Sequence, residues 1–297
     1  MKYLTTALLL LCSSVTAQVT TPTIPTLSGK FDAGGLKLFI ECFGKAKSGQ
    51  STVIVQDGLS GFGSRNDWKK VIGPISKHHQ ICHFDRAGLG KSDAVTGAYH
   101  VKKAAEQLHA LLGSANVKGP YLLVGHSLAS YHVRLFNHLY SSEVSGILLV
   151  DPSVDGMMHD RATGWRPKTE KYSEQLTKMM NHSIKEWNNP HQTYEKLDYK
   201  LGYQQLISAR DFADKPYRLL MAKGRDKMSA TPPGDWPKPR WDRILQWHYQ
   251  GIKKMKTLST QAKVFFSTTK EHGIHDEEPK IVIKHIQGLL RDIARSN

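Results

Sequence analysis

The chain has 297 residues, of which 39% are hydrophobic and 23% charged, so it can bury one substantial core and is neither disordered nor fibrous in composition. Its 41 Lys and Arg residues against 26 Asp and Glu give a formal net charge of +15, which could favour anionic surfaces but does not define a fold. The basic residues are scattered and form no nucleic-acid-binding motif, so nucleic acid is not an expected partner.

Residues 1–17 have the pattern of a secretory signal peptide. Lys2 is followed by a short apolar run and then by small residues that end at Ala17. The run is shorter than the roughly 20 apolar residues that span a bilayer, and no later stretch is longer, so we expect no membrane span. Cleavage after Ala17 would make the mature protein secreted or periplasmic. The alternative is a buried first strand. Residues 18–27 are expected to form an extended leader.

Short apolar runs separated by amphipathic helical patterns follow along the chain. The helical patterns include Ala104–Leu112 and Val282–Ile293. Alternation of this kind predicts a mostly parallel sheet that is covered by helices on both faces. The predicted strands are Leu36–Phe43, Thr52–Gln56, Gln80–Phe84, Tyr121–Val124, Gly146–Val150, Tyr217–Met221 and Lys263–Ser267.

The strand pattern disappears between about Ser153 and Lys215. This polar stretch predicts two or three short helices. An insertion between two core strands would lie over the carboxyl edge of the sheet, where open α/β sheets bind ligands, so a cap over a pocket is expected. The alternative is a peripheral decoration that does not touch the substrate. The later stretch Ser229–Trp241 is rich in proline and is predicted to be a loop.

A candidate nucleophile follows the strand that begins at Tyr121. The residues Gly125-His126-Ser127-Leu128-Ala129 stand between this strand and a helical pattern. A serine in such a position lies on a sharp strand-to-helix turn with its hydroxyl exposed. Small residues are needed two places before and after it, and Ala129 stands where Gly is usual. The alternative is a buried serine in an ordinary turn.

Four motifs in order resemble those of the α/β-hydrolase fold family, over roughly residues 30–294. Asp85–Asp93 is similar to the Asp-Arg-x-Gly-x-Gly-x-Ser segment that follows the family's fourth strand, and Gln56–Gly61 occupies the family's His-Gly place. Gly146–Ser153 resembles the sixth strand and its exit, and Glu271–His275 resembles the C-terminal histidine turn. The resemblance implies an eight-stranded, mostly parallel sheet flanked by helices, with a helical cap inserted after the sixth strand. The core would be formed by residues 28–152 and 216–297, and the cap by residues 153–215.

A serine hydroxyl needs a base within hydrogen-bond reach, and a carboxylate behind that base fixes its tautomer. The family order of Ser, acid and His implies Ser127 first and the histidine turn last. Within that turn His272 is favoured as the base over His275. The acid stays open between Asp151, which closes the sixth strand, and Asp226, which follows the seventh with an offset of one residue.

The oxyanion of the reaction needs two backbone N–H donors. Leu128, directly after the nucleophile, is expected to supply one, and Leu59, after Asp57-Gly58, the other. By the same resemblance, Asp85 and Arg86 are a buried pair that holds adjoining loops. His126 is expected to be structural, because the turn directs it away from Ser127.

These residues imply an exported serine hydrolase that cleaves a carboxylic ester or related small acyl compound, without a cofactor or metal. Rivals on the same fold are a lactonase, an amidase, a C–C hydrolase or a cofactor-free perhydrolase, and from another class a non-catalytic binding protein. Neither the substrate nor the oligomeric state can be read from the sequence.

Two cysteines, Cys42 and Cys82, remain after removal of the signal peptide. The resemblance implies that their strands are neighbours, so a disulfide is possible. Two reduced, buried thiols are the equal alternative.

Overall fold

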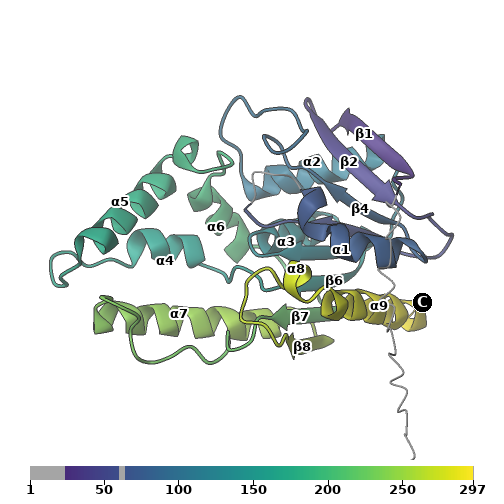
Figure 1. The fold of residues 1–297 in the computed structure, drawn as a ribbon. Helices are drawn as coiled ribbons and strands as arrows, with labels where there is room; N and C mark the ends of the chain where they lie inside the picture. Colours follow the sequence, from purple (N-terminus) through teal and green to yellow (C-terminus); the bar gives the residue numbers. More distant parts are fainter. Residues whose placement is uncertain (1–23, 60–63, 297) are drawn as a thin grey trace, which may run out of the picture.

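A computed structural model describes residues 24–59 and 64–296, without the side chains of residues 64–67. Within these ranges eight strands form one sheet in the order β1-β2-β4-β3-β5-β6-β7-β8 (Figure 1). The pairs β1/β2 and β2/β4 are antiparallel, and the other pairs are parallel. The expected eight-stranded, mostly parallel sheet is therefore confirmed.

All the predicted strands form, and their ends shift only slightly. The strands are β1 (Leu27–Asp32), β2 (Lys37–Phe43), β3 (Thr52–Gln56), β4 (Ile81–Phe84), β5 (Tyr121–His126), β6 (Val144–Val150), β7 (Tyr217–Met221) and β8 (Ala262–Phe266). Strand β1 was not predicted, and Leu27, expected to end the leader, is its first residue. Because β1 is an edge strand whose residues alternate between half-buried and exposed, it lacks the continuous apolar run of the central strands.

Helices cover both faces of the sheet. Successive residues of a central strand pack on opposite faces, so Leu123 belongs to one apolar cluster and Leu122 to the other. The first cluster packs against α2 (Val101–Ser114) and α3 (Ala129–Leu139). The second packs against α1 (Ser64–Ser76) and α9 (Pro279–Ser296), on the opposite side (Figure 1). This double coverage explains why the strands are apolar throughout.

The segment between β6 and β7 contains α4 (Met157–Thr163), α5 (Glu174–Asn188), a short 3-10 turn at Pro190–Gln192 and α6 (Tyr199–Ile207), as the helical prediction requires. These inserted helices, α4 to α6, lie with α7 (Lys238–Lys256) beyond the carboxyl ends of the central strands (Figure 1).

The loop predicted over Ser229–Trp241 is wrong at its end, because α7 already begins at Lys238. Pro237 caps this helix and a further proline lies in its first turn, where the missing N–H costs no hydrogen bond. Among residues 24–59 and 64–296, no helix combines the length and apolar character that crossing a membrane requires.

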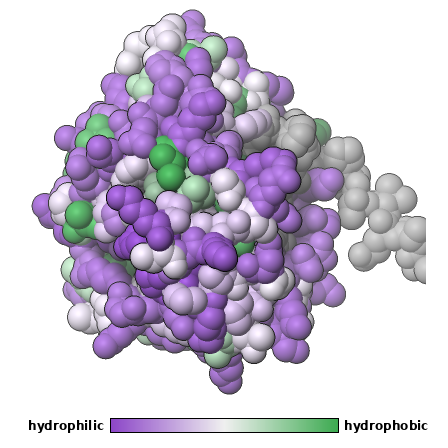
Figure 2. All heavy atoms as spheres, turned by 90° about the vertical axis from the view of Figure 1, so that its left-hand side faces the viewer, coloured by the Kyte–Doolittle hydropathy of each residue, from purple (hydrophilic) through white to green (hydrophobic). Residues whose placement is uncertain are grey.

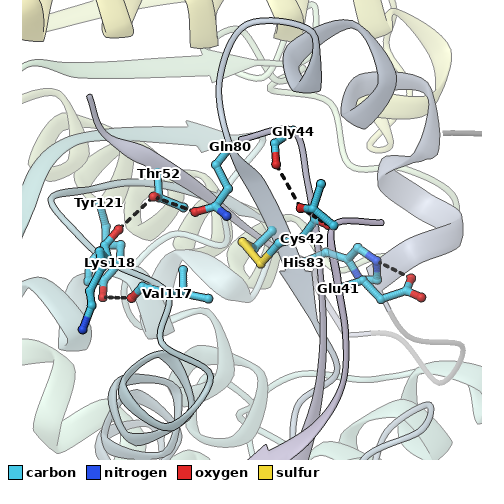
Figure 3. Close-up of a disulfide and its surroundings, with 11 residues drawn as sticks. Glu41, Cys42, Gly44, Thr52, Gln80, His83, Val117, Lys118 and Tyr121 are labelled. Carbon is cyan, nitrogen blue, oxygen red and sulfur yellow. Dashed lines mark hydrogen bonds and ion pairs between the residues drawn. A yellow bond between two sulfur atoms is a disulfide. The ribbon is translucent and has the colours of Figure 1, made fainter. Parts of the chain in front are cut away.

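The expected proximity of Cys42 and Cys82 on neighbouring strands is also confirmed. The two residues face each other across the antiparallel pair of β2 and β4, with a Cα separation of 4.0 Å, and are joined by a disulfide (Figure 3). On the same strands, the neighbouring side chains Glu41 and His83 are hydrogen-bonded over 3.1 Å. Both pairs fasten β2 to the parallel part of the sheet.

Candidate active site

Ser127 lies in the sharp turn between β5 and α3. Its φ of +51° is in the left-handed region that residues with side chains rarely adopt. The packing around the turn is tight: a Cβ added to Gly125 would lie 2.8 Å from the Val133 side chain, and Ala129 is fully buried. The carbonyl of Ser127 accepts hydrogen bonds from the N–H groups of Ser130 and Ser153. This is the strand–turn–helix setting in which a serine hydroxyl is exposed at the edge of a sheet.

His272 lies in the loop before α8 (Ile274–Glu277), and its Nδ1 is 2.6 Å from Oδ2 of Asp151. Because a carboxylate accepts, Nδ1 donates, and the neutral imidazole keeps the unprotonated Nε2 as its basic nitrogen. The His272 side chain is 52% exposed, whereas that of Asp151 is 2% exposed. An exposed imidazole is thus oriented by a buried carboxylate.

The Asp151 carboxylate is kept ionised by its contacts. It directly follows β6, whose neighbour β5 ends just before Ser127, and it accepts the N–H of Ala222 over 3.0 Å. Arg225 Nε lies 3.3 Å from the same oxygen. Burial alone would raise the pKa of Asp151, but the His272 hydrogen bond, the charge of Arg225 and the Ala222 N–H together hold the pKa below its ordinary value.

The structure brings Asp151, and not Asp226, to His272. Asp226 is half-buried in the loop after β7, and no described hydrogen bond joins it to the histidine turn. His275 is buried and stacks on Trp68 at 4.5 Å between ring centroids. Burial lowers the pKa of His275 to about 3, because the charged form is disfavoured there. His275 is therefore a packing residue behind the exposed His272.

His126 contacts the histidine turn through its backbone and its ring. Its Nε2 donates to the His272 carbonyl over 3.0 Å, and its ring lies 4.5 Å from that of His272. This contact agrees with the structural role expected from the sequence.

The Asp57-Gly58-Leu59 loop lies against Ser127. A Cβ added to Gly58 would be 2.8 Å from the Ser127 Cβ, so only glycine allows this approach. Leu59 follows Gly58 with a half-exposed side chain, and the buried Leu128 follows Ser127 as the N-cap residue of α3. Of the two expected N–H donors, one thus belongs to the residue directly after Ser127 and the other to the residue directly after Gly58. Residues 60–63 lie outside the described residues.

Arg86 holds the same loop from behind. Its guanidinium donates to the carbonyls of Asp57 over 2.6 Å and Gly58 over 2.5 Å. It also forms a bidentate ion pair with Glu195, from the inserted segment, over 2.8 and 2.5 Å. Burial would lower the pKa of Arg86, but the Glu195 carboxylate outweighs it and raises that pKa. Sequence reasoning missed Glu195, because a polar, motif-free stretch offers no signal for it.

Asp57, His126 and His275 form the one described group that could hold a metal ion, with ligand atoms within 4.8 Å of one another. His126 Nδ1 lies 3.5 Å from Asp57 Oδ1. The sequence predicts no metal site, because its histidines do not pair with cysteines or carboxylates at metal-ligand spacings. The fold gathers these three residues from distant parts of the chain. The rings of His126 and His275 pack at 4.4 Å, so we assign the group to the support of the histidine turn.

A pocket of about 560 Å³ opens beside the site, a volume typical of small-molecule sites. Leu59, Val154 and Arg225 form its end near the sheet, and residues of α4, α5, α6, α7 and the loops beside them line the rest. The molecular face on which these helices lie is mostly hydrophilic, with a small apolar group near its middle (Figure 2). The apolar lining includes Met157, Met158, Met179, Trp165, Trp236, Trp241 and Trp247.

Comparison with known proteins places this architecture in a family. A model of the alpha/beta hydrolase fold matches residues 51–231, so the chain belongs to the α/β-hydrolase fold family. The uncharacterised protein YqjL of Bacillus subtilis is 25% identical over 225 residues, which is 75% of this chain and 78% of that protein. Several other curated relatives are matched over less than half of their length.

Solved structures share the fold at low sequence identity. A thermophilic esterase from Thermogutta terrifontis superposes with a TM-score of 0.58 at 16% identity, over 90% of this chain and 99% of its own. A putative aryl esterase from Burkholderia cenocepacia gives 0.58 at 17%, over 91% and 100%. These likenesses concern the fold.

Proposed function

We propose that the chain is a serine hydrolase that cleaves a carboxylic ester or related small acyl compound through an acyl-enzyme. One observation carries the proposal: the 2.6 Å contact between His272 Nδ1 and Asp151, in a histidine turn next to a serine on a strand-to-helix turn. A nucleophile, a base and an orienting carboxylate are the groups that acyl transfer requires.

The proposed reaction has two halves. Ser127 Oγ attacks the ester carbonyl while His272 Nε2 takes its proton, and the N–H groups of Leu59 and Leu128 stabilise the oxyanion. Collapse of this intermediate breaks the ester C–O bond, and the leaving alcohol takes the proton from His272. Water then attacks the acyl-enzyme with His272 again as base, which releases the acid and restores the Ser127 hydroxyl.

Export is part of the same proposal. The pattern of residues 1–17 supports a signal peptide cleaved after Ala17, and the Cys42–Cys82 disulfide supports an oxidising compartment such as the periplasm or the medium. We further infer that residues 153–215 form a cap over the substrate, because three of its helices and the pocket lie beyond the carboxyl ends of the strands.

A graded ester screen tests the activity. The mature protein is assayed on 4-nitrophenyl esters from acetate to dodecanoate, with Ser127→Ala as the matched variant. Wild-type protein should hydrolyse at least one ester, and the variant should lose several orders of magnitude in turnover. Equal rates for the two proteins would refute the nucleophile, and no hydrolysis of any ester would refute the substrate class.

A further inference from the structure

The carbonyls of Asp57 and Gly58 are both bound by one buried side chain. Arg86 Nη1 donates to the first and Nη2 to the second, and Arg86 is only 4% exposed. In a planar trans peptide the carbonyl and the following N–H point in opposite directions. Because the Gly58 carbonyl points to Arg86, the Leu59 N–H points away from it.

This arrangement prevents a flip of the Gly58–Leu59 peptide. A flip would aim the Leu59 N–H at a guanidinium cation and would turn the carbonyl oxygen outward. An oxygen placed there would repel the negative charge that develops during ester cleavage, whereas an N–H stabilises that charge. The position of the Arg86 guanidinium therefore determines whether the loop directs the Leu59 N–H or the Gly58 carbonyl oxygen toward the developing negative charge.

Glu195 fixes that guanidinium. Its carboxylate binds Nε and Nη2 of Arg86 and is itself held by the Tyr99 hydroxyl over 3.2 Å. The backbone around it is also fastened to the core: Tyr99 N–H donates to the Lys196 carbonyl, and Asp198 N–H donates to the Tyr99 carbonyl. Lys196 has a φ of +55°, a conformation that persists only where the surroundings enforce it.

We propose that Glu195 is a positioning residue for oxyanion stabilisation: it aligns Arg86, and Arg86 sets the Gly58–Leu59 peptide. The inserted segment then contributes to the chemical step as well as covering the pocket. The inference rests on the proposed function, since Leu59 is the assumed donor.

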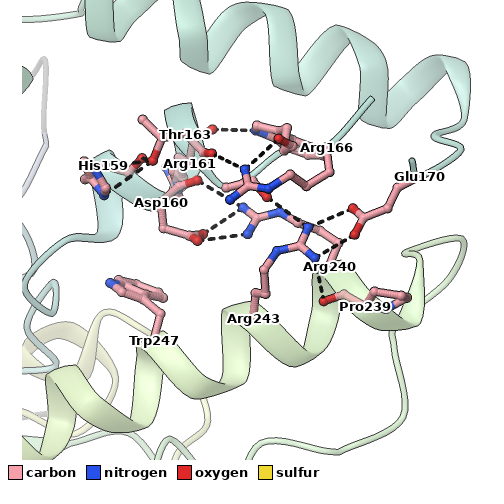
Figure 4. A network of polar contacts seen from close by, with 12 residues as sticks. His159, Asp160, Arg161, Thr163, Arg166, Glu170, Pro239, Arg240, Arg243 and Trp247 are labelled. Carbon is pink, nitrogen blue, oxygen red and sulfur yellow. Dashed lines mark hydrogen bonds and ion pairs between the residues drawn. The ribbon is translucent and has the colours of Figure 1, made fainter. Parts of the chain in front are cut away.

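The test compares two matched carboxylates. Glu170 also forms a bidentate pair with an arginine, Arg243 on α7 (Figure 4). It also accepts a tyrosine hydroxyl, that of Tyr172. It joins the inserted segment to α7, but it does not line the pocket or touch the Asp57–Leu59 loop. Glu195→Gln and Glu170→Gln therefore remove the same kind of ion pair. Only the Glu195 pair is linked, through Arg86, to the Asp57–Leu59 loop.

Values of kcat and KM are measured on the best ester of the screen, together with the inhibition constant of a trifluoromethyl ketone, whose adduct with serine mimics the oxyanion. Glu195→Gln should lower kcat by about tenfold or more with KM nearly unchanged, and should weaken the inhibitor by a similar factor. Glu170→Gln should leave kcat and inhibition unchanged, even where its thermal midpoint falls.

Several outcomes would overturn the proposal. The first is that the Glu195→Gln protein folds and keeps the wild-type kcat. The second is that only its KM changes. The third is that its kcat falls by no more than that of Glu170→Gln. If Glu195→Gln does not fold, Tyr99→Phe decides: it removes one donor to Glu195 and should lower kcat several-fold, and an unchanged kcat contradicts the inference. A wild-type protein without Ser127-dependent hydrolysis refutes the proposed function as well, whereas an active wild type with an unaffected variant refutes only the role of Glu195.

Discussion

Asp151 combines burial with three donors. His272, the Ala222 N–H and Arg225 all face its carboxylate, and together they outweigh the cost of desolvating a charge. Such a carboxylate stays ionised, as the proposed role of orienting His272 requires. Asp226 has no comparable set of described donors, although in the sequence its position after β7 suits an acid almost as well as that of Asp151, whose motif has no offset.

The two carboxylates can be separated by substitution. Asp151→Asn should lower turnover by a factor on the order of 10⁴, because an amide cannot hold the productive tautomer of His272. Asp226→Asn should change turnover less than about threefold, as expected of a loop residue away from the base. Steady-state kinetics of both variants on one ester provide the measurement. Small and equal losses would mean that another acid orients His272.

A second residue-scale prediction concerns Gly58. A methyl group at this position would meet the Ser127 Cβ at 2.8 Å, so Gly58→Ala must displace the loop or the serine. We expect a loss of kcat of about 10²-fold, the size seen when an oxyanion donor is misplaced. Gly113→Ala, in α2 with open space around it, is the matched control and should leave kcat unchanged. Wild-type kcat in Gly58→Ala would contradict the close approach.

At this scale the sequence predicts what is local. Ser127 is predictable because its motif, strand and helix are contiguous, and His272 because its turn is short. The choice of Asp151 over Asp226 needed the three-dimensional contact. Glu195 could not be predicted at all, because its partner Arg86 is 109 residues away and nothing around it forms a motif.

Among the elements, β2 and β4 are joined covalently. The disulfide closes a loop with a sequence separation of 40 between the two strands. Closing a loop of this length stabilises the folded state by about 3–5 kcal/mol in the chain-entropy model.

We therefore predict that the double variant Cys42→Ser/Cys82→Ser unfolds at a lower denaturant concentration, with a loss of stability of about 3–5 kcal/mol. Chemical denaturation of both proteins measures it. The oxidised, mature wild type should also show no free thiol after denaturation. Two titratable thiols would contradict the bond.

The errors in the predicted elements have a common physical origin. The buried central strands are continuous apolar runs and are readily found, whereas β1 is exposed along one side and pairs only with β2. The sequence pattern does not predict the start of α7 at Lys238, because prolines are typical both of loops and of first helical turns. Edges and helix starts depend on tertiary neighbours, which a local pattern does not contain.

For the molecule as a whole, buried histidines link stability to pH. Burial, with help from the Arg218 charge, lowers the pKa of His285 to about 4, and the Arg218 guanidinium donates to its Nδ1. Burial likewise lowers the pKa of His132 and His248. In the unfolded chain these groups have pKa values of about 6.5. Between about pH 6.5 and 4 the unfolded state binds more protons, so stability rises with pH and falls on acidification.

The free energy of unfolding should therefore decrease as the pH falls from about 6.5 to 4. His285→Gln should flatten this slope, by at most about 1.4 kcal/mol per pH unit for one proton. The exposed His191→Gln should leave the slope unchanged. Denaturant titrations across this pH range provide the test, and an identical slope for wild type and His285→Gln would show that His285 titrates alike in both states.

The proposed mechanism depends on a single nucleophilic atom, Ser127 Oγ, so the central claim is best tested on that atom. The mature protein is treated with a fluorophosphonate probe, and the labelled peptide is mapped by mass spectrometry. We expect one covalent label, on Ser127, that is absent from Ser127→Ala and much slower to form in His272→Ala. A label on another residue, or wild-type labelling of Ser127→Ala, would contradict it.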